Sequence, residues 1–279
     1  MKVTYFGTTM LLFNDGKDQV LFDCHVTRPS LLKCFAGDLN IDKKTADQVL
    51  KDYDFSRLRA IFVSHSHHDH VMDMPYFARK TGCAVYGSSS TLNVARGGKV
   101  KEELLHEFSL NAAYAVGAFK IRIIPSIHSK AHWYNDDLGQ TIDEPIKYPA
   151  RKKDFKEGGS FDFYVEHKGK KIVIRPSYNY IKGQWDGMKA DVLFLGIAGI
   201  SKDSEKRKTE FFAETIEKLG PSLVIPVHWD NFFVPLYGKI KGQPSLMEDT
   251  GKSIYELARY CGKHDISCVV QPPLTSFEI

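Results

Sequence analysis

Four of the eleven histidines of this chain lie within seven residues, in the segment Ser-His-Ser-His-His-Asp-His that starts at position 64. The segment follows an apolar run of strand length, and extended backbone projects residues i and i+2 to the same side. His65 and His67 can therefore bind one cation together. If the chain then turns into a helix, Asp69 and His70 can face a second cation. Imidazole and carboxylate ligands favour Zn²⁺, with Mn²⁺ and Fe²⁺ as alternatives.

Two further histidines follow other predicted strands. His128 comes after an apolar run at 121–127, and His228 comes after another at 223–227. Open α/β sheets place their ligands at the ends of strands, so both side chains are candidates for the same site. Six side chains thus become candidate metal ligands, scattered between positions 65 and 228.

The elements that must position these side chains alternate between strands and helices. Helices are expected at 46–53, 74–80, 92–96, 209–219 and 253–261. Strands are expected at 3–13 and 19–23, joined as a hairpin by an Asn-Asp-Gly turn, and at 58–63, 84–86, 113–116, 119–124, 161–166, 171–174, 192–197, 223–227 and 268–271. Two sheets sandwiched by helices fit this order.

This pattern resembles the metallo-β-lactamase fold superfamily of metal-dependent hydrolases, whose HxHxDH signature is complete here. The resemblance extends over nearly the whole chain. It implies one domain over residues 1–279 with α/β architecture, a four-layer αββα sandwich of two mixed β-sheets flanked by helices. It also implies a dinuclear site at one edge of the sheets. The first metal would be held by His65, His67 and His128, the second by Asp69, His70 and His228, with Asp23 as a supporting aspartate.

Two short motifs look like one branch of the superfamily. Arg28-Pro29-Ser30 and the segment from His228 to Phe232 resemble the branch of ascorbate-6-phosphate lactonases and N-acyl-phosphatidylethanolamine phospholipase D-like enzymes. Branch membership does not fix a substrate.

Ser177 is a departure from the family pattern. It stands at the end of a strand where the family usually supplies a metal-bridging aspartate. A neutral hydroxyl is a weaker ligand than a carboxylate, so the second metal is expected to bind less tightly. We expect two divalent ions, most simply Zn²⁺, with a single or altered metal as the alternatives.

Other side chains are candidates for supporting the site or contacting the substrate. His132 lies near the start of a polar insertion at about 129–159. This insertion is too long for an idle connection and is interpreted as an active-site cover or partner-binding segment. Tyr178 could assist as a hydrogen-bond donor. Trp229 is either core packing or a wall of an apolar pocket.

The resemblance implies hydrolysis of an ester, lactone or phosphodiester bond in a small molecule by a metal-bound hydroxide, with Asp69 orienting the nucleophile. Two alternatives remain open. One is a nuclease or phosphodiesterase acting on nucleic acid. The other is a non-catalytic metal-binding relative with a weakened second site.

Composition limits the partners. The 38 Lys and Arg against 34 Asp and Glu leave a net charge of +4, too small to indicate a nucleic-acid partner. No run of about 20 apolar residues predicts an integral membrane segment. The N-terminal residues do not form a secretory signal, and the five cysteines suggest no disulfide framework, so a cytoplasmic location is expected. The sequence does not reveal the oligomeric state.

Overall fold

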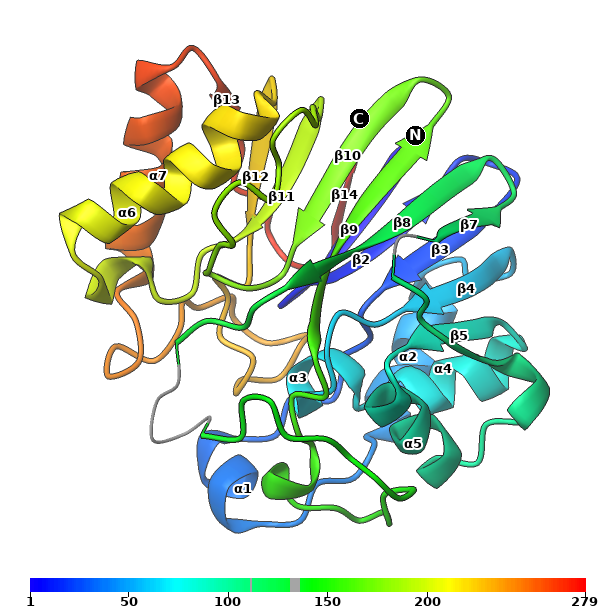
Figure 1. Ribbon diagram of the computed structural model, residues 1–279. Helices are drawn as coiled ribbons and strands as arrows, with labels where there is room; N and C mark the ends of the chain where they lie inside the picture. The colour runs from blue at the N-terminus through cyan, green and yellow to red at the C-terminus, as the bar shows by residue number, and fades with distance from the viewer. Residues whose placement is uncertain (111, 131–135) are drawn as a thin grey trace.

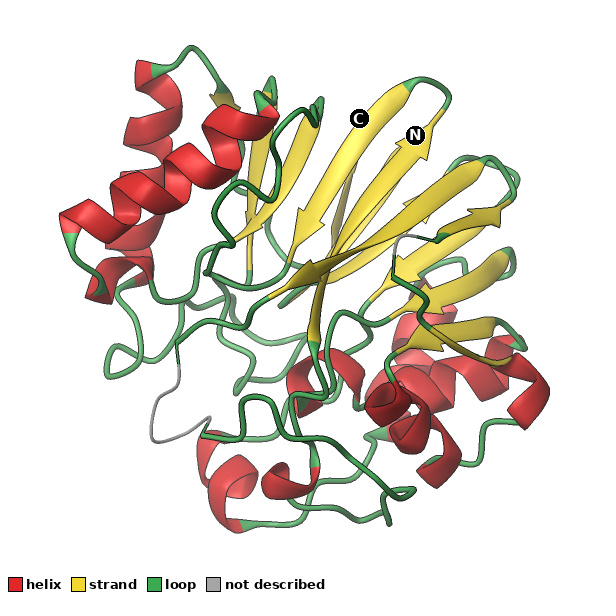
Figure 2. Cartoon of the chain, viewed as in Figure 1, coloured by secondary structure: helices red, strands yellow, loops and turns green. Residues whose placement is uncertain are grey.

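The computed structural model describes residues 1–110, 112–130 and 136–279. Over these residues the chain forms two seven-stranded sheets, with helices on the outer faces (Figures 1 and 2). Both sheets mix parallel and antiparallel strands. The four-layer αββα sandwich predicted from the sequence is confirmed. None of the helices in the described ranges has the length and apolar character that a transmembrane span needs.

The first sheet has the strand order β14-β1-β2-β3-β4-β5-β6. Neighbours from β14 to β3 are antiparallel, and those from β3 to β6 are parallel. Its strands are β1 (Lys2–Gly7), β2 (Met10–Asn14), β3 (Gln19–Phe22), β4 (Leu58–Phe62), β5 (Ala84–Gly87), β6 (Leu105–Glu107) and β14 (Thr275–Glu278).

The second sheet repeats this plan in the order β13-β12-β11-β10-β9-β8-β7. Neighbours from β7 to β10 are antiparallel, and those from β10 to β13 are parallel. Its strands are β7 (Ala113–Val116), β8 (Phe119–Ser126), β9 (Ser160–His167), β10 (Lys170–Arg175), β11 (Val192–Gly196), β12 (Leu223–Val227) and β13 (Ser267–Cys268).

Helices cover each sheet on its outer face (Figure 1). The first sheet packs against α2 (Lys43–Asp52), α4 (Met74–Thr81) and α5 (Ser89–Gly97), and the second against α6 (Glu205–Phe212) and α7 (Thr250–Lys263). A π-helical turn, Ala213–Glu217, continues α6. Two short helices, α1 (Leu31–Ala36) and α3 (His68–Val71), lie at the edge of the sandwich where the candidate ligands are found.

Aromatic side chains fill the space between the sheets. Phe163 of β9 packs against Phe22 and Phe62 of the first sheet, with ring centroids 5.1 and 6.2 Å apart. All three are fully buried. This packing fixes the two sheets relative to each other, and therefore also the loops that leave their edges.

The structure corrects the sequence prediction at both ends of the chain. The single strand expected at 3–13 is two strands, β1 and β2, because the chain reverses at Gly7 and Thr8, which have φ of +101° and +53°. The last strand expected at 268–271 ends at Cys268 as β13. The final strand is instead β14, which pairs with β1. Helix α1 and strand β6 were not predicted.

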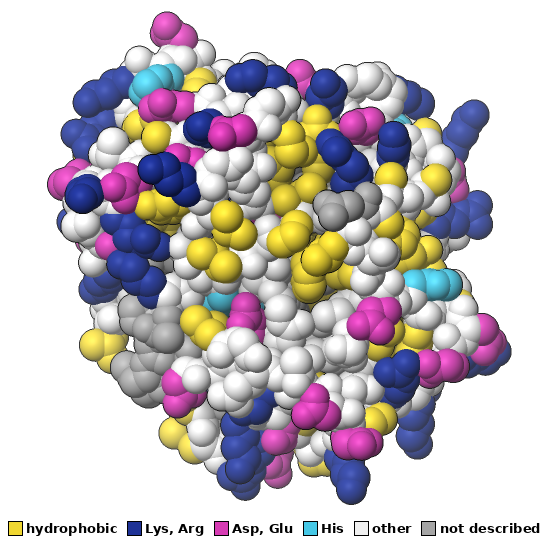
Figure 3. All heavy atoms as spheres, viewed as in Figure 1, with side chains coloured by type: hydrophobic (Ala, Val, Ile, Leu, Met, Phe, Trp, Pro, Cys, Tyr) yellow, Lys and Arg dark blue, Asp and Glu magenta, His cyan; other side chains and the backbone are white. Residues whose placement is uncertain are grey.

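Lysine and arginine side chains do not gather into one basic stripe on the face shown in Figure 3. They are interspersed there with aspartate and glutamate. On this face, the charge distribution agrees with the small net charge of the sequence.

Candidate metal centre

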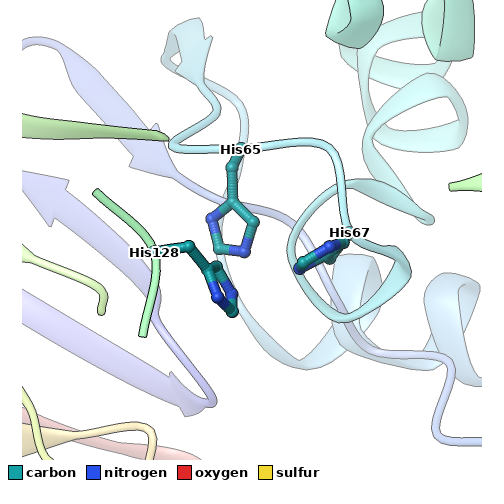
Figure 4. Close-up of side chains that lie close together, drawn as sticks. All are labelled: His65, His67 and His128. Carbon is teal, nitrogen blue, oxygen red and sulfur yellow. The ribbon is translucent and has the colours of Figure 1, made fainter. Parts of the chain in front are cut away.

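Three histidines form a compact cluster. His65 and His67 come from the loop after β4, and His128 comes from the segment after β8 in the other sheet. One ring nitrogen of each lies within 4.8 Å of one nitrogen of the others. The ring centroids are 4.7 to 4.9 Å apart, and the three rings point toward a common space (Figure 4).

Asp69, His70 and His228 form a second cluster beside the first. His70 Nε2 lies 3.2 Å from His228 Nε2, and the Asp69 Oδ2 oxygen lies 3.6 Å from His70 Nε2 and 3.3 Å from His228 Nε2. The ring centroids of His65 and His70 are 3.8 Å apart, so the two clusters adjoin. The structure thus brings together all six side chains that the sequence analysis selected.

The backbone around residue 67 explains how one short segment serves both clusters. The chain is extended as it leaves β4, and His67 (φ −63°, ψ 148°) precedes α3 as its N-terminal capping residue. The amide of His70 donates to the His67 carbonyl at 2.9 Å, which begins the helical turn. The extended part therefore presents His65 and His67, and the helix presents Asp69 and His70 on its first turn.

His228 enters the site through an uncommon backbone conformation. Its φ is +60°, a left-handed value that non-glycine residues rarely adopt. Its amide donates to the Thr8 carbonyl at 2.6 Å. Two residues later, the Asp230 carboxylate accepts the Thr8 amide at 2.7 Å and the Tyr5 hydroxyl at 2.8 Å. The turn between β1 and β2 thereby holds the loop that carries His228.

Neighbouring groups fix three of the histidine rings through their Nδ1 atoms. His70 Nδ1 lies 2.7 Å from the Asp23 carboxylate, as expected for a supporting aspartate. His65 Nδ1 lies 3.1 Å from the Ser64 hydroxyl, and His128 Nδ1 lies 3.0 Å from the Ser129 carbonyl. Such contacts orient imidazole ligands and leave the Nε2 lone pair for a cation.

The donor set fits a divalent cation. The buried Nε2 atom of His65 has no hydrogen-bond partner among the described residues, and the His70 and His228 Nε2 atoms face each other. Burial, reinforced by the neighbouring histidines, holds the pKa of His65 well below its usual value and lowers that of His128 to about 3. Neutral imidazoles are the form that binds metals. Burial would raise the pKa of Asp69, but His70 and His228 outweigh it and keep that pKa low.

A cavity of about 240 Å³ opens onto both clusters. One part of its wall is apolar and consists of Phe35, Phe155, Phe232, Phe233 and Met247. Another part carries the cationic side chains of Lys130, Lys202 and Arg207. Asp203 pairs with Lys130 at 3.1 Å and with Arg207 at 3.0 Å.

The remaining candidates occupy different positions. Ser177 and Tyr178 line the cavity, and the Tyr178 hydroxyl donates to Asp203 at 3.3 Å. Burial and the nearby Asp203 raise the pKa of Tyr178, so its hydroxyl remains a donor at neutral pH. Trp229 is buried in the hydrophobic core and is not among the described residues that line the cavity. His132 lies outside the described residues.

Sequence reasoning missed an acidic neighbour of the clusters. The Asp137 carboxylate lies 3.1 Å from His67 Nε2. Asp137 belongs to the polar insertion, where Asp136 and Asp143 are also found. Nothing in the spacing of these acids distinguishes Asp137, so only the folded chain singles it out.

Two sheets in an αββα sandwich, with a histidine and aspartate centre at their shared edge, define the metallo-β-lactamase fold. Residues 18–229 match the family model described as the beta-lactamase superfamily domain, and the chain belongs to that superfamily.

Individual relatives are distant. The chain is 24% identical over 238 residues to a UPF0173 metal-dependent hydrolase of Shouchella clausii, covering 83% of this chain and 87% of that protein. Among solved structures, a metallo hydrolase of the archaeon Ignicoccus hospitalis superposes with a TM-score of 0.61 at 16% identity, covering 100% of this chain and 98% of that one. An isothiocyanate hydrolase from Delia radicum gut bacteria gives 0.62 at 14% identity, covering 100% and 99%. At these identities the structures support the fold alone.

Proposed function

We propose that this protein is a metal-dependent hydrolase that cleaves an ester, lactone or phosphodiester bond in a small molecule. The observation that carries the proposal is the pair of adjoining ligand clusters on the wall of one cavity. Relatives named metal-dependent hydrolases support the same class of activity.

In this proposal His65, His67 and His128 hold one divalent cation, and Asp69, His70 and His228 hold a second. Zn²⁺ suits these nitrogen and oxygen donors best. A cation held there would acidify water to a pKa of about 7 and polarise the bond under attack. Asp69 orients the attacking water by accepting its hydrogen bond. Ser177 supplies no carboxylate, so the second cation binds less tightly than the first.

The cavity supports a substrate with an apolar group and a negatively charged group. Aromatic side chains, including Phe232 and Phe233, bury apolar surface on one wall, while the Lys202 ammonium favours an anion on another. The cavity volume suits a small molecule. A nucleic-acid substrate is disfavoured by the small net charge of +4.

Two finer assignments stay proposals. The branch that contains ascorbate-6-phosphate lactonases and N-acyl-phosphatidylethanolamine phospholipases rests on the motifs around Arg28 and His228. The other is the cytoplasmic location.

The experiment that tests the proposal combines metal content with turnover. The protein is loaded with Zn²⁺ or Mn²⁺ and assayed on a panel of chromogenic esters, lactones and phosphodiesters, with and without an anionic group. We expect His67→Ala to bind less metal and to lose all turnover. His106→Ala is the control, because this exposed histidine stacks on Tyr86 outside the cavity and should leave both unchanged. Bound metal without turnover across the panel would favour the non-catalytic alternative.

A further inference from the structure

We infer that Asp137, which belongs to the polar insertion, is a positioning residue that orients His67 for metal binding. The inference rests on the proposed function, because it assumes that His67 is a ligand. The two side chains meet between His67 Nε2 and Asp137 Oδ2 at 3.1 Å, and His67 and Asp137 are only 8% and 9% exposed.

The contact with Asp137 determines which ring nitrogen of His67 is available to bind a metal ion. A carboxylate can only accept, so the hydrogen of the neutral imidazole lies on Nε2 and the lone pair lies on Nδ1. A carboxylate that accepts the hydrogen of the imidazole in this way makes the imidazole a stronger ligand.

The insertion holds Asp137 through a second acid. Asp137 Oδ2 also accepts the amide of Glu157 at 2.9 Å. The Glu157 side chain accepts the Gly139 amide at 2.6 Å and the Ser160 hydroxyl at 2.7 Å, so it ties the insertion to the start of β9. The Glu157 carbonyl accepts the amide of Ser66, next to His67, at 2.8 Å. The insertion therefore contacts the loop after β4 at two successive residues, Ser66 and His67.

The hydrogen-bond partner of His67 is more distant in sequence than the partners of His65, His70 and His128. The partners of His65 and His128 are adjacent in sequence, and the partner of His70 follows β3. His67 depends on a segment 70 residues further along the chain. We therefore assign the insertion a structural part in completing the first cluster, besides any role in covering the cavity.

The test compares three variants. Asp137→Ala removes the acceptor, and Asp137→Asn keeps an acceptor oxygen but removes the charge. Asp136→Asn alters the exposed neighbouring acid and is the matched control. For each metal-free protein, Zn²⁺ affinity is measured by competition with a chromogenic chelator, and Co²⁺ binding by its d–d absorption spectrum. Thermal melting of the metal-free proteins is recorded in parallel.

We expect Asp137→Ala to weaken Zn²⁺ binding by about 10- to 100-fold and to alter the Co²⁺ spectrum. Asp137→Asn should fall between Asp137→Ala and the wild type, and Asp136→Asn should bind like the wild type. Asp137→Asn carries the test if Asp137→Ala does not fold. Wild-type affinity and an unchanged Co²⁺ spectrum in the Asp137 variants, even with a lowered melting temperature, would overturn the inference. A wild-type protein that binds neither metal would overturn the proposed function itself.

Discussion

Asp23 connects several groups around the candidate site. Its carboxylate accepts the Ser64 amide at 2.7 Å and the Ser64 hydroxyl at 2.9 Å, contacts His70 Nδ1 at 2.7 Å, and also accepts the Thr9 hydroxyl. It is 1% exposed. Asp23 therefore joins the end of β3 to the ligand loop and fixes the His70 ring, although it is not part of either cluster.

We predict that Asp23→Asn weakens metal binding by about 10- to 100-fold, because the amide cannot accept from all these donors and loses the charge that supports His70. Stability of the metal-free protein should fall by about 1–3 kcal/mol. Metal titration and urea unfolding measure the two effects, with Asp143→Asn as the control for an exposed acid. An Asp23→Asn protein with wild-type metal affinity would show that His70 does not need this partner.

Asp73 is a buried acid that holds the loop after β3 through hydrogen bonds. Its carboxylate accepts the amides of Val26 and Thr27, each at 2.7 Å, and the Thr27 hydroxyl at 2.5 Å. Burial raises the pKa of Asp73 to about 6 despite these hydrogen bonds. Because the folded-state pKa exceeds the ordinary value of 3.8, the folded protein binds more protons than the unfolded chain between about pH 4 and 6.

The contribution of Asp73 to stability should therefore be largest below about pH 4 and decline as the pH rises through 6. We predict that the stability advantage of the wild type over Asp73→Asn shrinks between pH 4 and pH 7. Urea unfolding of both metal-free proteins at several pH values measures this difference. An advantage that grows as the pH rises would contradict the prediction.

At the scale of elements, the two motifs that resemble the lactonase and phospholipase branch contact each other. Arg28, from the Arg-Pro-Ser motif, forms an ion pair with Asp230, from the His-Trp-Asp-Asn motif, at 2.8 Å. Both side chains are buried, at 4% and 1% exposure. Arg28 Nη2 also donates to the Phe6 carbonyl at 3.0 Å. In this structure both residues of the ion pair fasten the β1–β2 turn to the loop of His228, and neither of them lines the cavity.

Gly7 allows this ion pair to approach the backbone. Its φ is +101°, and an added Cβ would overlap the Arg28 guanidinium and lie 2.5 Å from the Asp230 carboxylate. We predict that Gly7→Ala destabilises the protein by about 3 kcal/mol or more, because strain adds to the loss of the pair. Gly16→Ala is the control, since Gly16 has a φ of +89° but no heavy atom within 4 Å of the added group.

Gly16→Ala should cost only about 1 kcal/mol, from backbone strain alone. Urea unfolding of both variants, together with metal titration, separates the two effects. Equal losses of stability in the two variants would mean that the Arg28–Asp230 pair adjusts without cost.

At the scale of the whole molecule, the candidate centre depends on the packing of the two sheets. His65, His67, Asp69 and His70 follow a strand of the first sheet, while His128 and His228 follow strands of the second. Strand β14 pairs with β1, so the first sheet combines residues from opposite ends of the sequence. We accordingly propose that residues 1–279 fold as one domain.

We predict that Phe163→Ala lowers the free energy of unfolding by about 3–5 kcal/mol and also weakens metal binding, although Phe163 lies between the sheets and does not line the cavity. The cavity left by the ring would let the sheets shift relative to each other. Tyr255→Ala removes a 62% exposed ring on α7 and should change stability by less than about 0.5 kcal/mol. Stability lost in Phe163→Ala with unchanged metal affinity would show that the centre tolerates such a shift.

The sequence by itself determined the fold class and the choice of candidate ligands. His65 and His67 could be recognised from the local sequence. They follow an apolar strand and are two residues apart, which is the period of extended backbone. His128 and His228 could be selected because each follows an apolar run. The structure brings all of them into two adjoining clusters.

Tertiary structure alone decided the partners that hold these ligands. Asp137 reaches His67 across 70 residues, and Arg28 meets Asp230 from the other end of the chain. The strand β14 was missed in the same way, since its place is set by pairing with β1. Contacts between distant residues leave no periodicity in the sequence, because they are specified by how the sheets pack and not by the local backbone.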